Sequence, residues 1–184
     1  MCPCCEAAGA PTGERVGLQG HGIRWRPQTG PDAVDGEPFD DEVPTRRYRC
    51  LKCGAVIVVL PTGLLPRLRY RPTAVVVALA LWARSGLAAA QVRRRVAQKE
   101  PASHEAERGW PSLRRWAHRA WDWWGLRRPT EGRGSFEERV EALLQRLASR
   151  ARDGTTELVE AALQAAQSFD GHSVCATPEV TPTS

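Results

Sequence analysis

The stretch Cys50-Leu51-Lys52-Cys53-Gly54, together with Cys2-Pro3-Cys4-Cys5 near the start, decides the fold of the first third of this chain. In each stretch two cysteines are separated by two residues, Cys2 from Cys5 and Cys50 from Cys53. Two residues between thiolates allow a tight turn to direct both sulfurs at one tetrahedral ion. Gly54 supplies the positive φ angle that such a turn often needs. The spacing therefore predicts a four-cysteine site for structural Zn²⁺.

Three further residues, Cys4, His21 and Cys175, could each be interpreted in more than one way. Cys4 is either a spare thiol or a competitor of Cys5 for the ion. His21 is either a substitute ligand or, as we expect, a polar residue of a hairpin. Cys175 stands alone in a polar tail, where we expect a free thiol. Disulfide bonds would indicate a secreted chain, and residues 1–20 show no apolar segment of a secretory signal.

Length and hydropathy limit the class of protein. The 184 residues suffice for one ordinary domain or two small ones. A ribbon of about 60 residues buries too little apolar surface to fold without its metal. The longest apolar run, residues 74–83, is too short to span a bilayer. We therefore expect no membrane contact and, because the cysteines would be reduced, a cytoplasmic location.

Charge is distributed unevenly along the chain, whose formal net charge is +5. Residues 1–43 hold three basic and eight acidic residues, and residues 129–184 hold five and nine. Residues 44–128 hold eighteen basic and four acidic residues, and sixteen of those eighteen are Arg. A cationic block of this kind is typical of proteins that bind polyanions, most often nucleic acid. A GC-rich genome would also raise the Arg content.

The ribbon is predicted to consist of residues 1–62. Residues 23–26 alternate apolar and basic side chains, which indicates a half-buried strand. Residues 27–44 are rich in Pro, Gly and Asp and are predicted to form a loop. Two further strands are predicted at residues 46–50 and 55–60, on either side of the second cysteine pair.

Three helices are predicted in residues 72–126. Pro72 suits the first turn of a helix that covers residues 74–84, although Val75-Val76-Val77 would also suit a strand. A second helix is expected at residues 87–97, with Arg93, Arg94 and Arg95 across one side.

The third helix is predicted to begin at Pro111 and to be amphipathic. One face collects apolar side chains for the core: Leu113, Trp116, Ala117, Ala120, Trp121 and Trp124. The opposite face carries Arg115, His118, Arg119 and Asp122, and an Arg/His front of this kind is typical of a DNA recognition helix. The connector before it, residues 98–110, has about thirteen residues where a helix-turn-helix has three or four. The alternatives are therefore an enlarged helix-turn-helix and a plain three-helix bundle, of which we expect the former.

A helical hairpin is predicted at residues 135–169. Ser135 and Glu138 form the capping-box pattern at the start of its first helix. Thr155 or Thr156 is expected to cap the second. The apolar faces of both helices would pack on the same chain or pair with a second copy as a homodimer.

The predicted fold class is thus α+β, with a small N-terminal β zinc ribbon followed by an all-α, helix-turn-helix-like bundle. Residues 170–184 are small and polar and are expected to be a disordered tail.

No catalytic site is predicted. A transposase of the usual kind needs three separated carboxylates that hold two metal ions. The acidic residues here cluster in a single loop: Asp32, Asp35, Glu37, Asp40, Asp41 and Glu42. We interpret them as a solvated loop, or as a screen for the basic block before DNA binds, and expect a protein that is not an enzyme.

The Cys-Pro-x-Cys start, the Gly20-His21-Gly22 stretch and the run Arg46-Arg47-Tyr48-Arg49-Cys50-x-x-Cys53-Gly54-Ala55 together resemble a known group. They are similar to the zinc-binding N-terminal region of some bacterial insertion-sequence transposases, and to small zinc-ribbon proteins found beside mobile-element genes in GC-rich bacteria. Leu60-Pro61, Leu65-Pro66-Arg67 and residues 109–116 extend the resemblance, which covers about residues 1–125.

This resemblance implies DNA binding in the context of a transposable element, with Cys2, Cys5, Cys50 and Cys53 as metal ligands. It also implies that Arg114, Arg115 and Arg119 contact DNA. We extend the predicted contacts to His118 and to two further groups of basic residues, Arg93, Arg94 and Arg95, and Arg46, Arg47 and Arg49.

The predicted function is DNA binding for a mobile element or its regulator, with a recombinase or transposase as a candidate partner. The alternative is a protein-protein interaction adaptor or oligomerisation module, for which an exposed Trp123–Trp124 patch would argue. RNA binding through exposed aromatic side chains is a third hypothesis.

Overall fold

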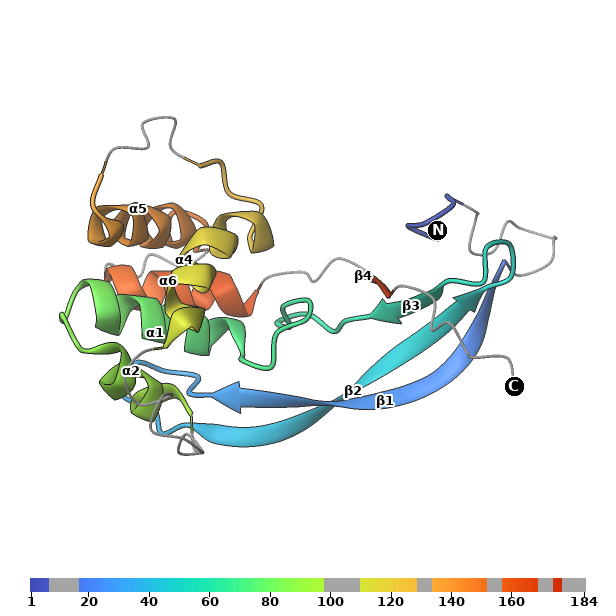
Figure 1. The fold of residues 1–184 in the computed structure, drawn as a ribbon, viewed down its shortest axis with the longest axis horizontal. Coiled ribbons are helices and arrows are strands. Elements are labelled where there is room, and N and C mark those ends of the chain that lie inside the picture. Colours follow the sequence, from blue (N-terminus) through green and yellow to red (C-terminus); the bar gives the residue numbers. More distant parts are fainter. Residues whose placement is uncertain (7–16, 98–109, 129–133, 152–156, 169–173, 177–184) are drawn as a thin grey trace. The chain divides into compact units, whose positions relative to one another are not determined.

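The computed structural model describes residues 1–6, 17–97, 110–128, 134–151, 157–168 and 174–176. Strands and helices both occur, so the fold is α+β, as predicted (Figure 1). In chain order the elements are β1 (Leu18–Gly30), β2 (Phe39–Cys50), β3 (Val56–Val59), α1 (Pro72–Ala83), α2 (Ala89–Val96), α4 (Pro111–Trp123), α5 (Phe136–Ala148), α6 (Leu158–Gln167) and β4 (Val174–Ala176). Among the described helices, none combines the length and the hydropathy that crossing a membrane requires.

The chain forms two compact units. Unit one comprises residues 1–26, 42–61 and 171–184, and unit two comprises residues 27–41 and 62–170. The segment 27–41 therefore belongs with the helices, although it lies within the region predicted as a ribbon. All the described helices fall in unit two, so the predicted three-helix segment and the predicted hairpin share one unit.

The strands form one sheet in the order β1-β2-β3-β4. Strands β2 and β3 are antiparallel, with Arg46 opposite Val59 and Tyr48 opposite Ile57. Strand β4 is antiparallel to β3, with Cys175 opposite Ile57. The prediction of a disordered tail is therefore wrong for residues 174–176, because the edge of β3 offers unpaired backbone groups to this segment. The rest of the tail lies outside the described residues.

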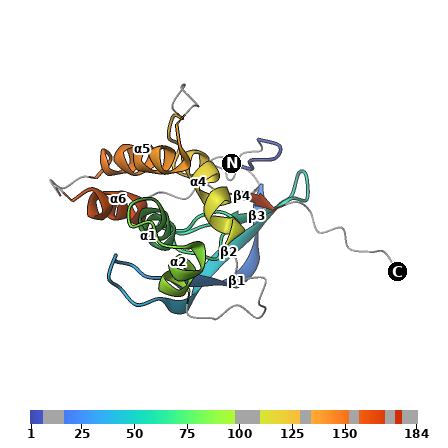
Figure 2. The same cartoon turned by 60° about the vertical axis from the view of Figure 1, so that its left-hand side comes forward.

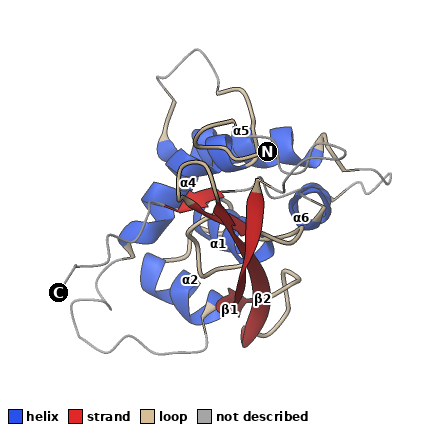
Figure 3. Cartoon of the chain, turned by 90° about the vertical axis from the view of Figure 1, so that its right-hand side faces the viewer, coloured by secondary structure: helices blue, strands red, loops and turns tan. Residues whose placement is uncertain are grey.

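The first two strands, drawn in red in Figure 3, are longer than predicted. Strand β1 continues to Gly30 and β2 begins at Phe39, so the prediction of a loop over residues 27–44 is wrong for most of that range. Bonds across the strands explain the extension. The Thr45 hydroxyl donates to the Arg24 carbonyl at 2.8 Å, and the Thr29 hydroxyl donates to Asp40 Oδ1. Such pairing overrides the weak strand preference of Pro, Gly and Asp.

Helix α1 lies at the centre of unit two and contacts α2, α4, α5 and α6. It begins with Pro72, as predicted, and nearly every residue from Thr73 to Ala80 is fully buried. An apolar segment that is surrounded by other helices gains from side chains on every face, which explains why a helix forms despite three consecutive valines. Helices α5 and α6 contact each other and α1 (Figures 1 and 2).

Helix α4 buries the apolar face that its sequence predicts. Leu113, Trp116, Ala117, Ala120 and Trp121 are all buried. Trp116 makes edge-to-face contacts with Tyr70 and Trp110, with ring centroids 4.8 Å and 4.7 Å away. Such pairs add to the stabilisation from buried area. The prediction that these tryptophans serve the core is confirmed.

Trp123 and Trp124 at the end of α4 do not form the exposed patch that would favour a protein-interaction adaptor. Trp124 is 1% exposed. Trp123 is half-buried and packs against the same core.

The N-terminal cap of α5 is the predicted one, whereas that of α6 differs from the prediction. At α5 the Ser135 amide donates to Glu138 Oε2 at 2.6 Å and the Glu138 amide donates to Ser135 Oγ at 3.1 Å, which is the predicted capping box. Helix α6 has Glu157 as its N-cap, without a side-chain bond, so the prediction of Thr155 or Thr156 is wrong. Burial of its alanine-rich face stabilises α6 instead.

The apolar faces of α5 and α6 are buried within unit two. The predicted connector, residues 98–110, falls outside the described residues apart from Trp110.

Candidate metal centre and basic surfaces

The four predicted cysteines come together in unit one. The Sγ atoms of Cys2, Cys5, Cys50 and Cys53 all lie within 4.8 Å of one another. The Sγ of Cys2 is 3.8 Å from that of Cys53, and the Sγ of Cys5 is 3.6 Å from that of Cys50. A tetrahedral ion with metal–sulfur bonds of about 2.3 Å separates its ligands by about 3.8 Å. The cluster therefore has the dimensions of a tetrahedral metal site.

Two equivalent turns present these thiols. The Gly54 amide donates to the Cys50 carbonyl at 2.9 Å, and the Glu6 amide donates to the Cys2 carbonyl at the same distance. Both donors have left-handed backbone angles, with φ of 74° at Gly54 and 58° at Glu6. The positive angle at Gly54 confirms the prediction. The one at Glu6 was missed, because nothing in a Glu side chain signals this conformation.

The first cysteine of each turn is fully buried, and the second is more accessible. Cys2 and Cys50 form a small core with Ile57, against which Cys5, Leu18 and Tyr48 pack. Cys53 is exposed. Because a core of this size buries little apolar surface, ligand bonds to a shared ion would have to supply most of the stability of unit one.

Backbone amides prepare Cys50 for metal binding. The backbone N–H of Cys53 makes the largest contribution in lowering the pKa of Cys50 from 9.0 to about 6. Burial acts in the opposite direction, while the N–H of Lys52 and the thiols of Cys5 and Cys53 add to the lowering. Since the thiolate is the form that binds metal, Cys50 is ready to act as a ligand at neutral pH.

The alternative ligands lie outside the cluster. Cys4 and His21 are exposed, and neither belongs to the group of four sulfurs. Only Cys5, three residues after Cys2, is placed by the turn beside Cys50. The backbone of Cys175 pairs with Ile57 in the sheet.

In unit two, the face of α4 opposite the core is basic. Arg114, Arg115, His118 and Arg119 are all exposed, as predicted. Asp122 is the acidic residue of this face, and Arg128 Nη2 lies 2.7 Å from its carboxylate. The same guanidinium donates to the His118 carbonyl at 3.1 Å. Arg128 therefore neutralises Asp122 and leaves the face cationic.

The other predicted basic groups are less uniform. On α2, Val92 and Val96 are buried while Arg94 and Arg95 are exposed and Arg93 is half-buried. The charge of Arg93 acts on Tyr70, whose pKa is nevertheless raised because burial dominates. On β2 of unit one, Arg46 and Arg49 are exposed and Arg47 is half-buried.

Carboxylates of the acidic cluster at residues 32–42 pair with two arginines of the basic segment 44–128 and neutralise their charge. In unit two, Arg69 Nη2 lies 3.5 Å from Asp40 Oδ2. Arg71 lies 3.6 Å from Asp32 and 3.2 Å from Asp41. Three of the six clustered carboxylates are thus paired within unit two, where the side chains of Asp32 and Asp41 are exposed and that of Asp40 is partly buried.

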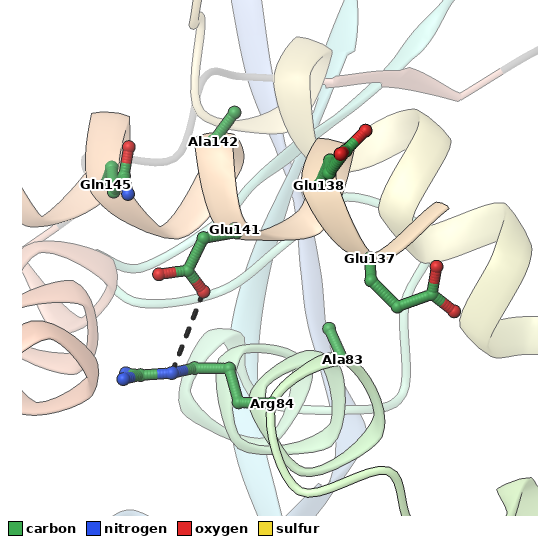
Figure 4. A pocket seen from close by; sticks show the side chains of 7 residues that line it. All are labelled: Ala83, Arg84, Glu137, Glu138, Glu141, Ala142 and Gln145. Atoms are coloured by element: carbon green, nitrogen blue, oxygen red, sulfur yellow. Dashed lines mark ion pairs between the residues drawn. The ribbon is translucent and has the colours of Figure 1, made fainter. Parts of the chain in front are cut away.

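A groove lies between the end of α1 and α5 (Figure 4). Arg84 Nε lies 3.7 Å from Glu141 Oε2 across it. Glu138 is occupied by the capping box. The remaining lining residues are Ala83, Glu137, Ala142 and Gln145.

No family model matches this chain, and no curated protein or solved structure matches it either. The resemblance to transposase N-terminal regions therefore stays a prediction.

Proposed function

We propose that this chain is a non-catalytic, zinc-dependent DNA-binding protein that serves a mobile element or its regulator. The observation that carries the proposal is the exposed basic face of α4, formed by Arg114, Arg115, His118 and Arg119 on a helix whose other face is buried. A rigid helix with a cationic front can enter the major groove and place Arg side chains against base edges.

Zinc is the ion that best suits the four thiols. Soft thiolate ligands in a tetrahedral set favour zinc over harder cations such as Mg²⁺ or Ca²⁺. A site closed by four protein ligands is structural, because no position is left for water or substrate. In this proposal the ion holds the two cysteine turns and the strands of unit one.

The remaining basic residues supply affinity. Arg94 and Arg95 on α2, and Arg46 and Arg49 on β2, are exposed and suit contacts with phosphates. Binding of this kind releases counterions and weakens with added salt. A transposase or recombinase remains the proposed partner, with the cytoplasm as the proposed location.

The test compares two double variants that remove the same charge from unit two. Arg115→Ala with Arg119→Ala alters the basic face of α4, whereas Arg139→Ala with Arg146→Ala alters exposed residues of α5. Binding to a labelled duplex is measured by fluorescence anisotropy. We expect the α4 variant to weaken binding at least about tenfold, and the α5 variant to have little effect.

The comparison separates a specific surface from general charge. Equal losses in both variants would show that net charge alone drives binding and would contradict the assignment to α4. Full affinity in the α4 variant would move the contact to another surface. Absence of binding by the wild-type protein at low salt would overturn the proposed function.

A further inference from the structure

An exposed aromatic face on unit one is not used by the core. Trp25 is 60% exposed and Ile23 is 58% exposed, so the prediction that these residues form a half-buried strand is wrong in its burial. The described part of unit one consists of strands and turns, with no helix to cover this face. Single exposed apolar side chains are common, but exposed apolar side chains that gather in one patch mark interaction sites.

The exposed residues lie on one face of the sheet. Residues two apart on a strand point to the same side, so Ile23 and Trp25 share a face of β1. A side chain at Gly22 would meet Arg47 on β2, which places those two positions together on the opposite face. Arg46 therefore shares the face of Ile23, and its partner across the sheet is Val59, which is 39% exposed. We call Ile23, Trp25, Arg46 and Val59 the Trp25 face.

The charge around this face indicates which kind of molecule binds there. Residues 18–26 and 42–53 of unit one carry six basic side chains and one acidic side chain, that of Glu42. A second copy that paired through this same face would bring the same positive charges and would be repelled. A polyanion would be attracted, and an exposed indole with a neighbouring guanidinium offers surfaces on which bases stack.

We propose that the Trp25 face binds single-stranded DNA, with Trp25 stacking on an unpaired base and Arg46 contacting the backbone. This proposal rests on the proposed function and deepens it, because it assigns unpaired DNA to unit one and duplex DNA to α4 of unit two. In a duplex, neighbouring base pairs cover the faces of each base. A flat side chain that projects from a strand therefore gains from stacking only where bases are unpaired.

The experiment measures the affinity of the zinc-loaded full chain for fluorescein-labelled (dT)15 and for a labelled duplex. Stacking on one base corresponds to a loss of roughly 5- to 150-fold on alanine substitution. Trp25→Ala should therefore weaken (dT)15 binding by a factor in this range and leave duplex binding unchanged. Trp25→Phe should restore most of the affinity, whereas Trp25→Leu, which is apolar but cannot stack, should not.

Leu51→Ala is the matched control, because Leu51 is 59% exposed in the same unit but belongs to the second cysteine turn. It should bind (dT)15 as the wild type does. Zinc content is measured for each variant to establish that unit one is folded.

Several results would overturn the inference while the proposed function stands. These are duplex binding without (dT)15 binding, unchanged (dT)15 affinity in Trp25→Ala, full affinity in Trp25→Leu, or equal losses for both DNAs. Tighter binding of (rU)15 than of (dT)15 would replace DNA by RNA as the ligand. A Trp25→Ala variant that changes from dimer to monomer in sedimentation would make the face a contact between copies. Failure of the wild type to bind either DNA would overturn both proposals.

Discussion

Glu6 and Gly54 occupy the same position in the two cysteine turns. Each donates its amide hydrogen at 2.9 Å to the carbonyl of the cysteine four residues earlier, and each has a left-handed backbone. Only Gly adopts this conformation without steric strain. The two turns are thus alike in geometry but unequal in energy, since Glu6 carries strain that Gly54 does not.

Single substitutions at these two positions should change the metal affinity in opposite directions. Glu6→Gly relieves strain and should stabilise the metal-bound form by up to about 1 kcal/mol. Gly54→Ala should destabilise it by about 1–2 kcal/mol through the backbone alone, because a Cβ there has no atom within 4 Å. Competition with a chelator measures both effects. Gly20→Ala, which also meets no atom within 4 Å and has an ordinary φ angle, is the control and should leave affinity unchanged.

Removal of the metal should unfold unit one and spare unit two. Unit one has a core of a few residues around Cys2, Cys50 and Ile57, whereas unit two buries a large cluster around α1. Hydrogen exchange after chelation should show lost protection at β3 and retained protection at α1. Cys50→Ser should reproduce the chelated pattern. Protection at β3 that survives chelation would contradict the assignment of a structural ion.

Metal retention should depend on pH through Cys50. The pKa of Cys50 is about 6, below its ordinary value of 9.0, so the folded state favours the thiolate. The stability contributed by this thiolate is complete above pH 9 and is lost as the pH falls to about 6. Competition between protons and the metal for this thiolate should therefore grow as the pH falls below 9 and become strongest near and below pH 6. Release measured with a metal-binding dye should be small at pH 7.5 and large at pH 5, and release already complete near pH 8 would contradict the lowered pKa.

Gly30→Ala should destabilise unit two. A Cβ at Gly30 would lie 2.1 Å from the Cβ of Ala74 in α1, and the φ angle of 129° is unfavourable for any other residue. Overpacking and backbone strain together should lower the free energy of unfolding by at least about 2 kcal/mol. Gly20→Ala in the same strand, where space is open, should change it by less than about 0.5 kcal/mol. Similar melting temperatures for the two variants would show that β1 does not pack on α1 at Gly30.

Local patterns in the sequence predicted the features that depend on spacing. The two residues between paired cysteines placed all four sulfurs in one cluster. The helical periodicity of residues 113–124 predicted both the buried and the basic faces of α4. The pattern of Ser135 followed by Glu138 predicted the capping box, because both partners lie within one helical turn.

Features that depend on distant partners were not predictable in this way. Alternation at residues 23–26 indicated a strand but did not reveal whether another layer would cover Trp25. The pairing of Asp40 and Asp41 with Arg69 and Arg71 joins segments about thirty residues apart. Composition favoured a loop over residues 27–44, whereas pairing between strands decided the outcome.

The most direct test of a zinc-dependent DNA-binding protein is the salt dependence of duplex binding by the zinc-loaded chain, measured between 50 and 200 mM salt. A basic surface that contacts at least about three phosphates should lose affinity by roughly 40-fold or more over this range. Chelation should abolish any part of the binding that needs unit one. An affinity that does not change between 50 and 200 mM salt, or no binding at 50 mM, would contradict the proposed DNA-binding function.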